Sequence, residues 1–236
     1  LTYRGLKKAN EHPNIGIRAL ANLSGLKKQL QIQNLVFMIA PRVNAAGRMD
    51  DACKAVELFT AADEEIAREY AEALHADNDE RRQADRSITR EALQQIESNP
   101  QWEERVSTLV YQPDWHKGVV GIVASRLIET YHRPTIVLTR SGDEATGSAR
   151  SIPGFNLYEA IYACRDLLTR YGGHMAAAGM SLPHDQVDAF RERFEQAVSN
   201  SLDRALLTPS IRVDAEIQLD QIQPKFFDIL RQMEPF

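Results

Sequence analysis

The feature that most constrains the fold is the stretch 63–97, which contains neither glycine nor proline. Side chains such as Ile66, Tyr70 and Leu74 recur within it at steps of four, which matches the period of an α-helix. We therefore expect one continuous helix, on the order of 50 Å long at about 1.5 Å per residue. Its middle, 75–85, is almost wholly polar. A helix of that kind typically bridges two bodies, so we expect a long connector helix between two parts of the chain.

Strand and helix signals alternate beyond the long helix. Residues 106–111 and 135–139 are expected strands on either side of a helix at 118–131, and a second strand–helix pair is expected within 144–171. Because a strand–helix–strand unit is normally parallel, the pattern predicts an α/β fold with a mixed, largely parallel sheet flanked by helices. Residues 211–217 alternate apolar and polar side chains, which predicts one more strand.

Composition excludes several classes of protein. The 236 residues include 28 Lys and Arg against 33 Asp and Glu, a formal net charge of -5, so any polyanion site must be a local basic patch. The two cysteines, Cys53 and Cys164, are far apart, which fits a reducing cytoplasm better than a disulfide scaffold. No apolar run approaches the roughly 18 residues of a membrane span. We expect a cytoplasmic protein without a membrane partner.

The segment Gly147-Ser148-Ala149-Arg150-Ser151 places two hydroxyls and one guanidinium among small neighbours. Arginine makes bidentate, charge-assisted contacts to phosphate, and serine adds a neutral hydrogen bond, so Ser148, Arg150 and Ser151 are candidate phosphate ligands. The alternative is a surface turn whose arginine pairs with a carboxylate.

Two further motifs contain histidine. Gly172, Gly173 and His174 are expected to follow a helix, where the glycines free backbone N–H groups and the histidine donates to phosphate, acts as a general acid or binds a metal. The alternative is a Gly-Gly helix C-cap followed by a structural histidine. His116 and Lys117 precede a helix, whose N-terminus attracts anions. The alternative there is that Trp115 and His116 pack beneath the loop.

The segment 41–49 carries Arg42, Asn44 and Arg48 around small residues. These side chains are candidate substrate contacts, and the alternative is a loop held by arginine bonds to backbone carbonyls.

The acidic residues are interpreted as structural. No Asp/His cluster has the spacing of a metal-dependent nuclease centre, so no metal ligand is assigned. On the long helix a solvated face is expected to carry Arg81, Arg82 and Arg86, in ion pairs with Glu80 and Asp85.

Taken in order, these motifs resemble the RecJ family of single-strand-specific DNA exonucleases, within the DHH phosphoesterase superfamily. The resemblance covers nearly all of the chain. It rests on the segments 5–7, 39–48, 55–58, 78–83, 116–127, 147–151, 172–179 and 234–236.

The resemblance implies a domain order. Residues 1–60 correspond to the end of the DHH catalytic lobe, 61–100 to the connector helix, 101–205 to the DHH-associated domain, and 206–236 to the start of an oligonucleotide-binding barrel. Members of the family use Mn²⁺ or Mg²⁺ to hydrolyse single-stranded DNA from the 5′ end. The implied metal ligands precede Leu1, so this segment alone is expected to be inactive.

The resemblance also implies roles for residues. Ser148 and Arg150 bind the 5′ phosphate, and His174 holds the phosphodiester at the reaction centre as the catalytic residue of this segment. The other implied substrate contacts are Arg42, Asn44, Arg48, His116, Lys117, Ser151, Gly172 and Gly173. Implied partners are single-stranded DNA, a single-strand-binding protein and a DNA helicase, in DNA repair and recombination. The alternatives are an oligoribonuclease or nucleotide phosphatase of the same superfamily, and a non-catalytic nucleic-acid-binding scaffold.

Overall fold

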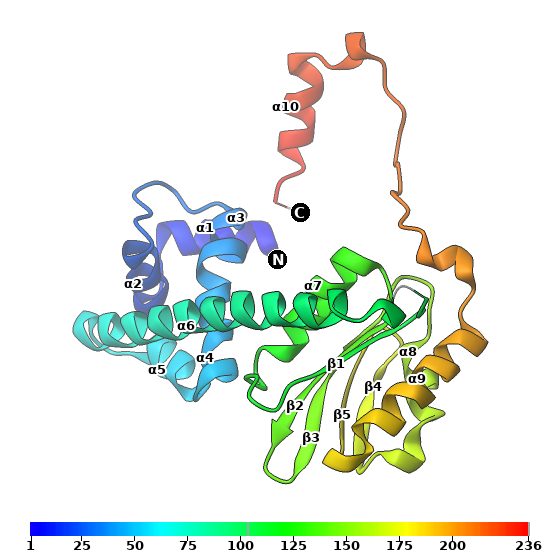
Figure 1. The fold of residues 1–236 in the computed structure, drawn as a ribbon. Helices are drawn as coiled ribbons and strands as arrows, with labels where there is room; N and C mark the ends of the chain where they lie inside the picture. Colours follow the sequence, from blue (N-terminus) through cyan, green and yellow to red (C-terminus); the bar gives the residue numbers. More distant parts are fainter. Residues whose placement is uncertain (103, 236) are drawn as a thin grey trace. The chain divides into compact units, whose positions relative to one another are not determined.

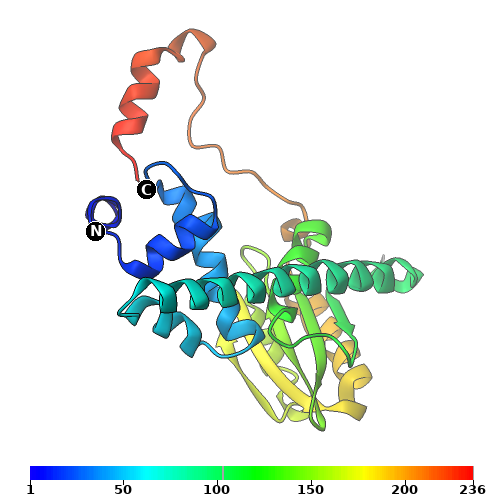
Figure 2. The ribbon, with the colours of Figure 1, turned by 90° about the vertical axis from the view of Figure 1, so that its left-hand side faces the viewer.

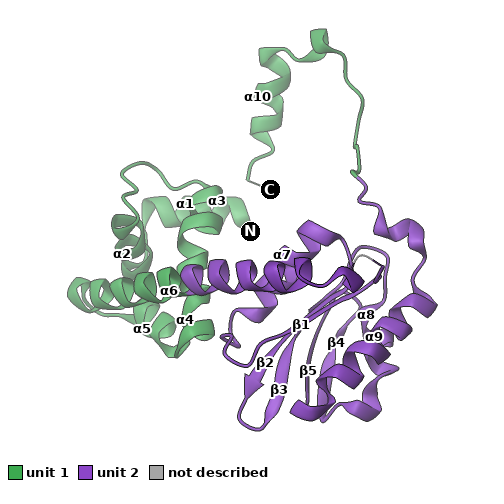
Figure 3. Cartoon of the chain, in the orientation of Figure 1, with its two compact units in different colours: residues 1–80, 211–236 green, residues 81–210 purple. Residues whose placement is uncertain are grey.

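The computed structural model describes residues 1–102 and 104–235. The chain forms two compact units, one from residues 1–80 and 211–236 and the other from residues 81–210 (Figure 3). The long helix is confirmed: α6 runs uninterrupted from Glu64 to Glu97 (Figures 1 and 2). It begins where the Asp63 carboxylate accepts the backbone N–H groups of Glu65 and Ile66, both at 2.9 Å, which satisfies two of the unpaired donors of the first turn.

The first unit is helical. Apart from the first part of α6, its helices are α1 (Thr2–Glu11), α2 (Ile15–Leu23), α3 (Ile32–Asn34), α4 (Ala40–Met49), α5 (Cys53–Thr60) and α10 (Pro224–Gln232). A π-helical turn over Leu35–Ile39 precedes α4. Leu20, Leu58 and Leu74 are fully buried and form the centre of its apolar core.

The prediction of a strand at 211–217 is wrong. These residues have no regular secondary structure, and all of their side chains are exposed. The alternating pattern is real, but a strand forms only where a neighbouring strand accepts and donates its backbone hydrogen bonds. No such neighbour is present among the described residues.

The second unit contains a five-stranded sheet in the order β1-β2-β3-β5-β4. Its strands are β1 (Thr108–Tyr111), β2 (Thr135–Ser141), β3 (Glu144–Arg150), β4 (Arg170–His174) and β5 (Ala177–Pro183). The α/β class and the mixed sheet are confirmed, and β1 and β2 are parallel as expected. The other three pairs are antiparallel, so the sheet is not largely parallel. The tight turn between β2 and β3, with Gly142 at φ 64°, reverses the chain at once.

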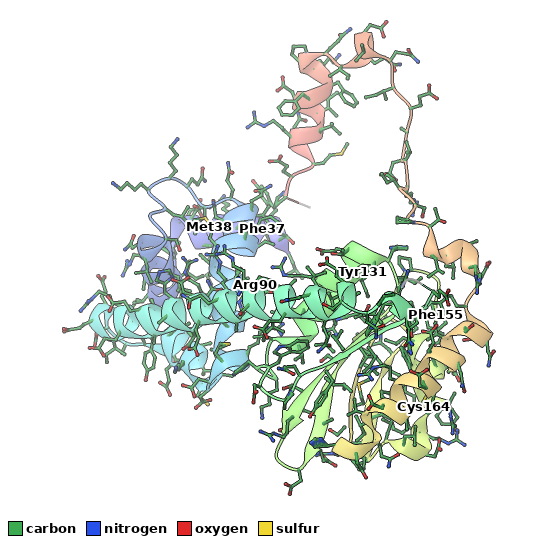
Figure 4. The ribbon with its side chains drawn as sticks, viewed as in Figure 1. Phe37, Met38, Arg90, Tyr131, Phe155 and Cys164 are labelled. Carbon is green, nitrogen blue, oxygen red and sulfur yellow. The ribbon has the colours of Figure 1, made fainter. Side chains whose placement is uncertain are left out.

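Helices cover both faces of this sheet (Figure 1). Helix α7 (Val120–Tyr131) packs on one face, and α8 (Leu157–Tyr162) and α9 (Val187–Ser201) pack on the other. The main core lies on the α8 and α9 side and includes Phe155 and Cys164, both labelled in Figure 4.

Candidate functional site

Strand alternation places Ser148 and Arg150 on the same face of β3. Successive side chains of a strand point to opposite faces, and Ala149 between them is fully buried in the core on the α8 and α9 side. Ser148 and Arg150 therefore face α7. Both are half-buried, which leaves their polar ends within reach of a ligand.

Gly121, in the first turn of α7, allows the helix to approach these two side chains closely. A Cβ atom at Gly121 would lie 2.9 Å from Nη2 of Arg150 and 3.3 Å from Oγ of Ser148. The guanidinium also donates from Nη1 to the carbonyl of Ala149 at 2.8 Å, which fixes its direction. The positive end of the α7 dipole, a guanidinium and a hydroxyl thus meet at one place. Each of the three attracts an anion.

The loop before α7 is held rigidly. Trp115 is buried, its indole N–H donates to Glu91 at 2.9 Å, and its carbonyl accepts the Thr139 hydroxyl at 2.6 Å. Nδ1 of His116 accepts the backbone N–H of Gly118 at 3.2 Å. Neutral His116 therefore carries its proton on Nε2, which remains able to donate. Lys117 is exposed beside it.

The Gly-Gly-His motif lies on a strand and not after a helix as expected. Gly172, Gly173 and His174 belong to β4, at the edge of the sheet, so the helix C-cap alternative is wrong. Gly173 has φ 152°, and a Cβ there would lie 2.5 Å from Cα of Ala178. Only glycine fits that position.

Register places His174 and Arg150 in one cross-strand row. Arg150 is opposite Ala177 in β5, and Ala177 is opposite His174 in β4. Cross-strand partners share a face of the sheet, and two strand spacings separate the backbones by about 10 Å. Nδ1 of His174 accepts the backbone N–H of Ala176 at 3.2 Å, so neutral His174 also presents an Nε2 proton.

A second row of the sheet lacks large side chains. Ser148 is opposite Gly179, which is opposite Gly172. A Cβ at Gly172 would meet nothing within 4 Å. This part of the sheet face, between Ser148 and the Arg150–His174 row, therefore carries no large side chain.

Two other polar residues of this sheet region, one after β3 and one at the far end of β4, form bonds within the chain. The Ser151 hydroxyl donates to the carbonyls of Ile152 and Phe155, at 3.2 and 2.9 Å, and closes the turn after β3. Arg170 donates to Glu144 at 2.7 Å. Hydrogen bonds from Thr169 and from Arg170 hold the pKa of the Glu144 carboxyl below its ordinary value.

In the first unit, the segment with Arg42, Asn44 and Arg48 is the helix α4, so the loop alternative is wrong. Its proline stands in the first turn, where a missing N–H costs nothing. Arg42 donates from Nε to His75 of α6 at 3.3 Å and from Nη1 to the carbonyl of Met38. Asn44 and Arg48 are exposed and one helical turn apart, on a different side of α4 from Arg42.

One expectation about α6 is wrong. Asp85 is 2% exposed and forms a bidentate pair with Arg126 of α7, with both N–O distances at 2.7 Å. A single carboxylate within a polar helical stretch gives no sequence signal of burial. Sequence reasoning also misses Gly121 as a site residue, although a lone glycine inside a Val-rich helical pattern is a signal of close approach.

Comparison with known proteins identifies the family. A DHHA1 domain model matches residues 105–200, which span the sheet and nearly all of α9. The single-stranded-DNA-specific exonuclease RecJ of Bacillus subtilis is 35% identical over 235 residues, and that of Escherichia coli is 33% identical over 245 residues. The chain belongs to the RecJ family. The alignments cover 98% and 100% of this chain but only 30% and 42% of those relatives.

Solved RecJ structures agree with this fold. The crystal structure of Thermus thermophilus RecJ in complex with Mn²⁺ matches 98% of this chain and 34% of that chain, at 30% identity and a TM-score of 0.85. A second structure of the same protein is in complex with Mg²⁺.

Residues 1–102 and 104–235 contain no group of three or more His, Cys, Asp or Glu that could hold a metal ion. The side chains of these described residues therefore do not fit a metal centre of their own. Within the same residues, no helix is long and apolar enough to cross a membrane.

Proposed function

We propose that this chain is the substrate-binding segment of a metal-dependent exonuclease that degrades single-stranded DNA from its 5′ end. One observation carries the proposal: Ser148 and Arg150 meet the N-terminal turn of α7 in a homologue of single-strand-specific nucleases. A terminal phosphate is small, doubly charged and rich in acceptors, which suits a guanidinium, a hydroxyl and backbone N–H groups acting together.

In this proposal each group has a distinct role. Arg150 supplies the charge-assisted contact, Ser148 donates one hydrogen bond, and His116 and Lys117 add to the positive field at the start of α7. His174 donates from Nε2 to the scissile phosphodiester, and the open backbone at Gly172 and Gly173 lets the strand approach the sheet. Ser151 supports the loop after β3.

The remaining assignments follow the family. The first unit contributes Arg42, Asn44 and Arg48, which contact the bound DNA or hold the parts of the enzyme together around it. Residues 1–60 belong to the DHH lobe, 61–100 to the connector, 101–205 to the DHH-associated domain and 206–236 to the start of a barrel. Mn²⁺ or Mg²⁺ bound outside this chain supplies the activated water. The whole protein acts in the cytoplasm in repair and recombination, with a single-strand-binding protein and a helicase.

The test compares 5′-phosphorylated with 5′-hydroxyl single-stranded DNA by fluorescence anisotropy. Arg150→Ala should remove a contact of roughly 1.5–3 kcal/mol, which is about a 10- to 150-fold loss, and the loss should fall mainly on the phosphorylated strand. Arg140→Ala removes the same charge from an exposed position of β2 near the turn to β3, and it should leave the preference intact. If Arg150→Ala weakens binding of the phosphorylated and the hydroxyl strand equally, Arg150 does not bind the 5′ phosphate.

A further inference from the structure

A second positively charged feature of the second unit lies away from Ser148 and Arg150. It is an open groove of about 720 Å³ along α6 and α7. Arg86, Thr89, Arg90 and Leu93 of α6 line it together with Arg126 of α7. Figure 4 labels Arg90 on α6 and Tyr131 at the end of α7.

The charges of this groove are only partly neutralised. The Arg126 guanidinium is held by Asp85 in the bidentate pair described above. Arg86 and Arg90 are exposed, and neither has a hydrogen-bond or ion-pair partner within residues 1–102 and 104–235. The acidic residue of the lining, Glu97, is about two turns along α6 from Arg90.

Two exposed arginines one turn apart destabilise a helix slightly, and an anion bound between them would relieve that repulsion. Residues at i and i+4 have Cβ atoms about 5–6 Å apart, and like charges at that spacing repel. The chain as a whole has a net charge of -5, so this local excess of positive charge is not a general property of its surface. The two side chains are therefore placed to share a polyanion.

We propose that this groove binds the phosphodiester backbone of a single nucleic-acid strand through Arg86 and Arg90. The proposal rests on the proposed function for the class of ligand, and it adds a subsite that no part of that function uses. A protein partner is disfavoured because the lining offers no exposed aromatic or large apolar side chain as an anchor. Arginine contacts to phosphate hold a strand without reading its sequence.

The groove and the terminal-phosphate site lie on different sides of α7. Gly121 faces Ser148 and Arg150 of the sheet, whereas Arg126 faces α6. Five residues separate them along the helix, a rise of about 7.5 Å, and the helix with its side chains is about 10 Å across. We expect a dinucleotide bound at the phosphate site not to contact Arg86 and Arg90. The groove therefore serves nucleotides further along the strand.

The experiment uses the chain with a 3′-fluorescein single strand of about 12 nucleotides and, in competition, a 5′-phosphorylated dinucleotide. The double variant Arg86→Ala/Arg90→Ala should bind the longer strand about five- to tenfold more weakly, and its dependence of log K on log salt should be shallower by about 1.4. Dinucleotide binding should not change. Arg18→Ala/Arg68→Ala removes two exposed arginines that are paired with Glu64 and Glu72, and it serves as the matched control.

The outcomes separate the two proposals. Arg150→Ala is measured with both probes and tests the terminal-phosphate site. If that site is wrong, the effect of the double variant on binding of the longer strand still tests the groove. Unchanged affinity and salt slope in the double variant would overturn the groove proposal, as would equal weakening of the dinucleotide. Displacement of the long strand by an oligoglutamate peptide more readily than by an unlabelled strand of equal charge would assign the groove to an acidic peptide instead.

Discussion

Replacing Gly121 with alanine tests whether close approach of α7 positions the phosphate ligands. The new Cβ would lie 2.9 Å from Nη2 of Arg150, and ordinary van der Waals contact begins near 3.4 Å. The guanidinium must therefore move by about 0.5 Å, and it can do so because it ends a flexible side chain. The backbone of α7 has no reason to shift.

Two effects on stability oppose each other in Gly121→Ala. Alanine is favoured over glycine inside a helix by up to about 1 kcal/mol, and the displaced Arg150 costs a similar amount. We expect the free energy of unfolding to change by less than about 1 kcal/mol. We expect the preference for 5′-phosphorylated over 5′-hydroxyl DNA to fall about three- to tenfold, because part of a charge-assisted hydrogen bond is lost.

The assay combines urea denaturation with anisotropy on both strands. Gly5→Ala is the matched control, since it places the same methyl group in a helix where nothing lies within 4 Å. It should leave DNA preference unchanged. An intact phosphate preference in Gly121→Ala, or a loss shared equally by Gly5→Ala, would refute the argument that this glycine positions Arg150.

Two further predictions concern stability, and both can be measured by chemical denaturation. Arg126→Ala should lower the free energy of unfolding by about 3–5 kcal/mol, because it removes the ion-pair partner of the buried Asp85 carboxylate. Asp85→Asn should lower it by only about 1–3 kcal/mol, because the half-exposed Arg126 can turn to water. A larger loss in Asp85→Asn than in Arg126→Ala would contradict the argument from burial. Gly173→Ala should destabilise by at least about 2 kcal/mol through positive φ and a clash with Ala178, while the adjacent Gly172→Ala should leave stability within about 1 kcal/mol. Equal effects of the two glycine variants would show that the difference in backbone geometry has no energetic consequence.

Local signals are sufficient to predict much of this fold. The long helix follows from periodicity and from the absence of glycine and proline. The β1–α7–β2 unit follows from alternating strand and helix patterns. The residue types of Ser148 and Arg150 make them candidate phosphate ligands without knowledge of the sheet, and their assignment to the 5′ phosphate stays a prediction.

Non-local effects explain the errors. A glycine pair after the short helix α8 has the appearance of a C-cap, and only pairing with β5 makes it a strand. A proline such as Pro41 is compatible with a loop and with the first turn of a helix. The burial of Ala45 and Ala46 favours the helix here. The sequence pattern puts Asp85 in solvent because a polar stretch carries no sign that a helix distant in sequence, α7, will cover one of its residues.

The position of Gly173 also bears on self-association. Strand β4 is an edge of the described sheet, and an unprotected edge offers backbone donors and acceptors to another chain. The strand is only five residues long, and the φ of 152° at Gly173 interrupts the regular pleat that an incoming strand would have to match. The conformation of Gly173 therefore discourages edge-to-edge aggregation between copies of the protein.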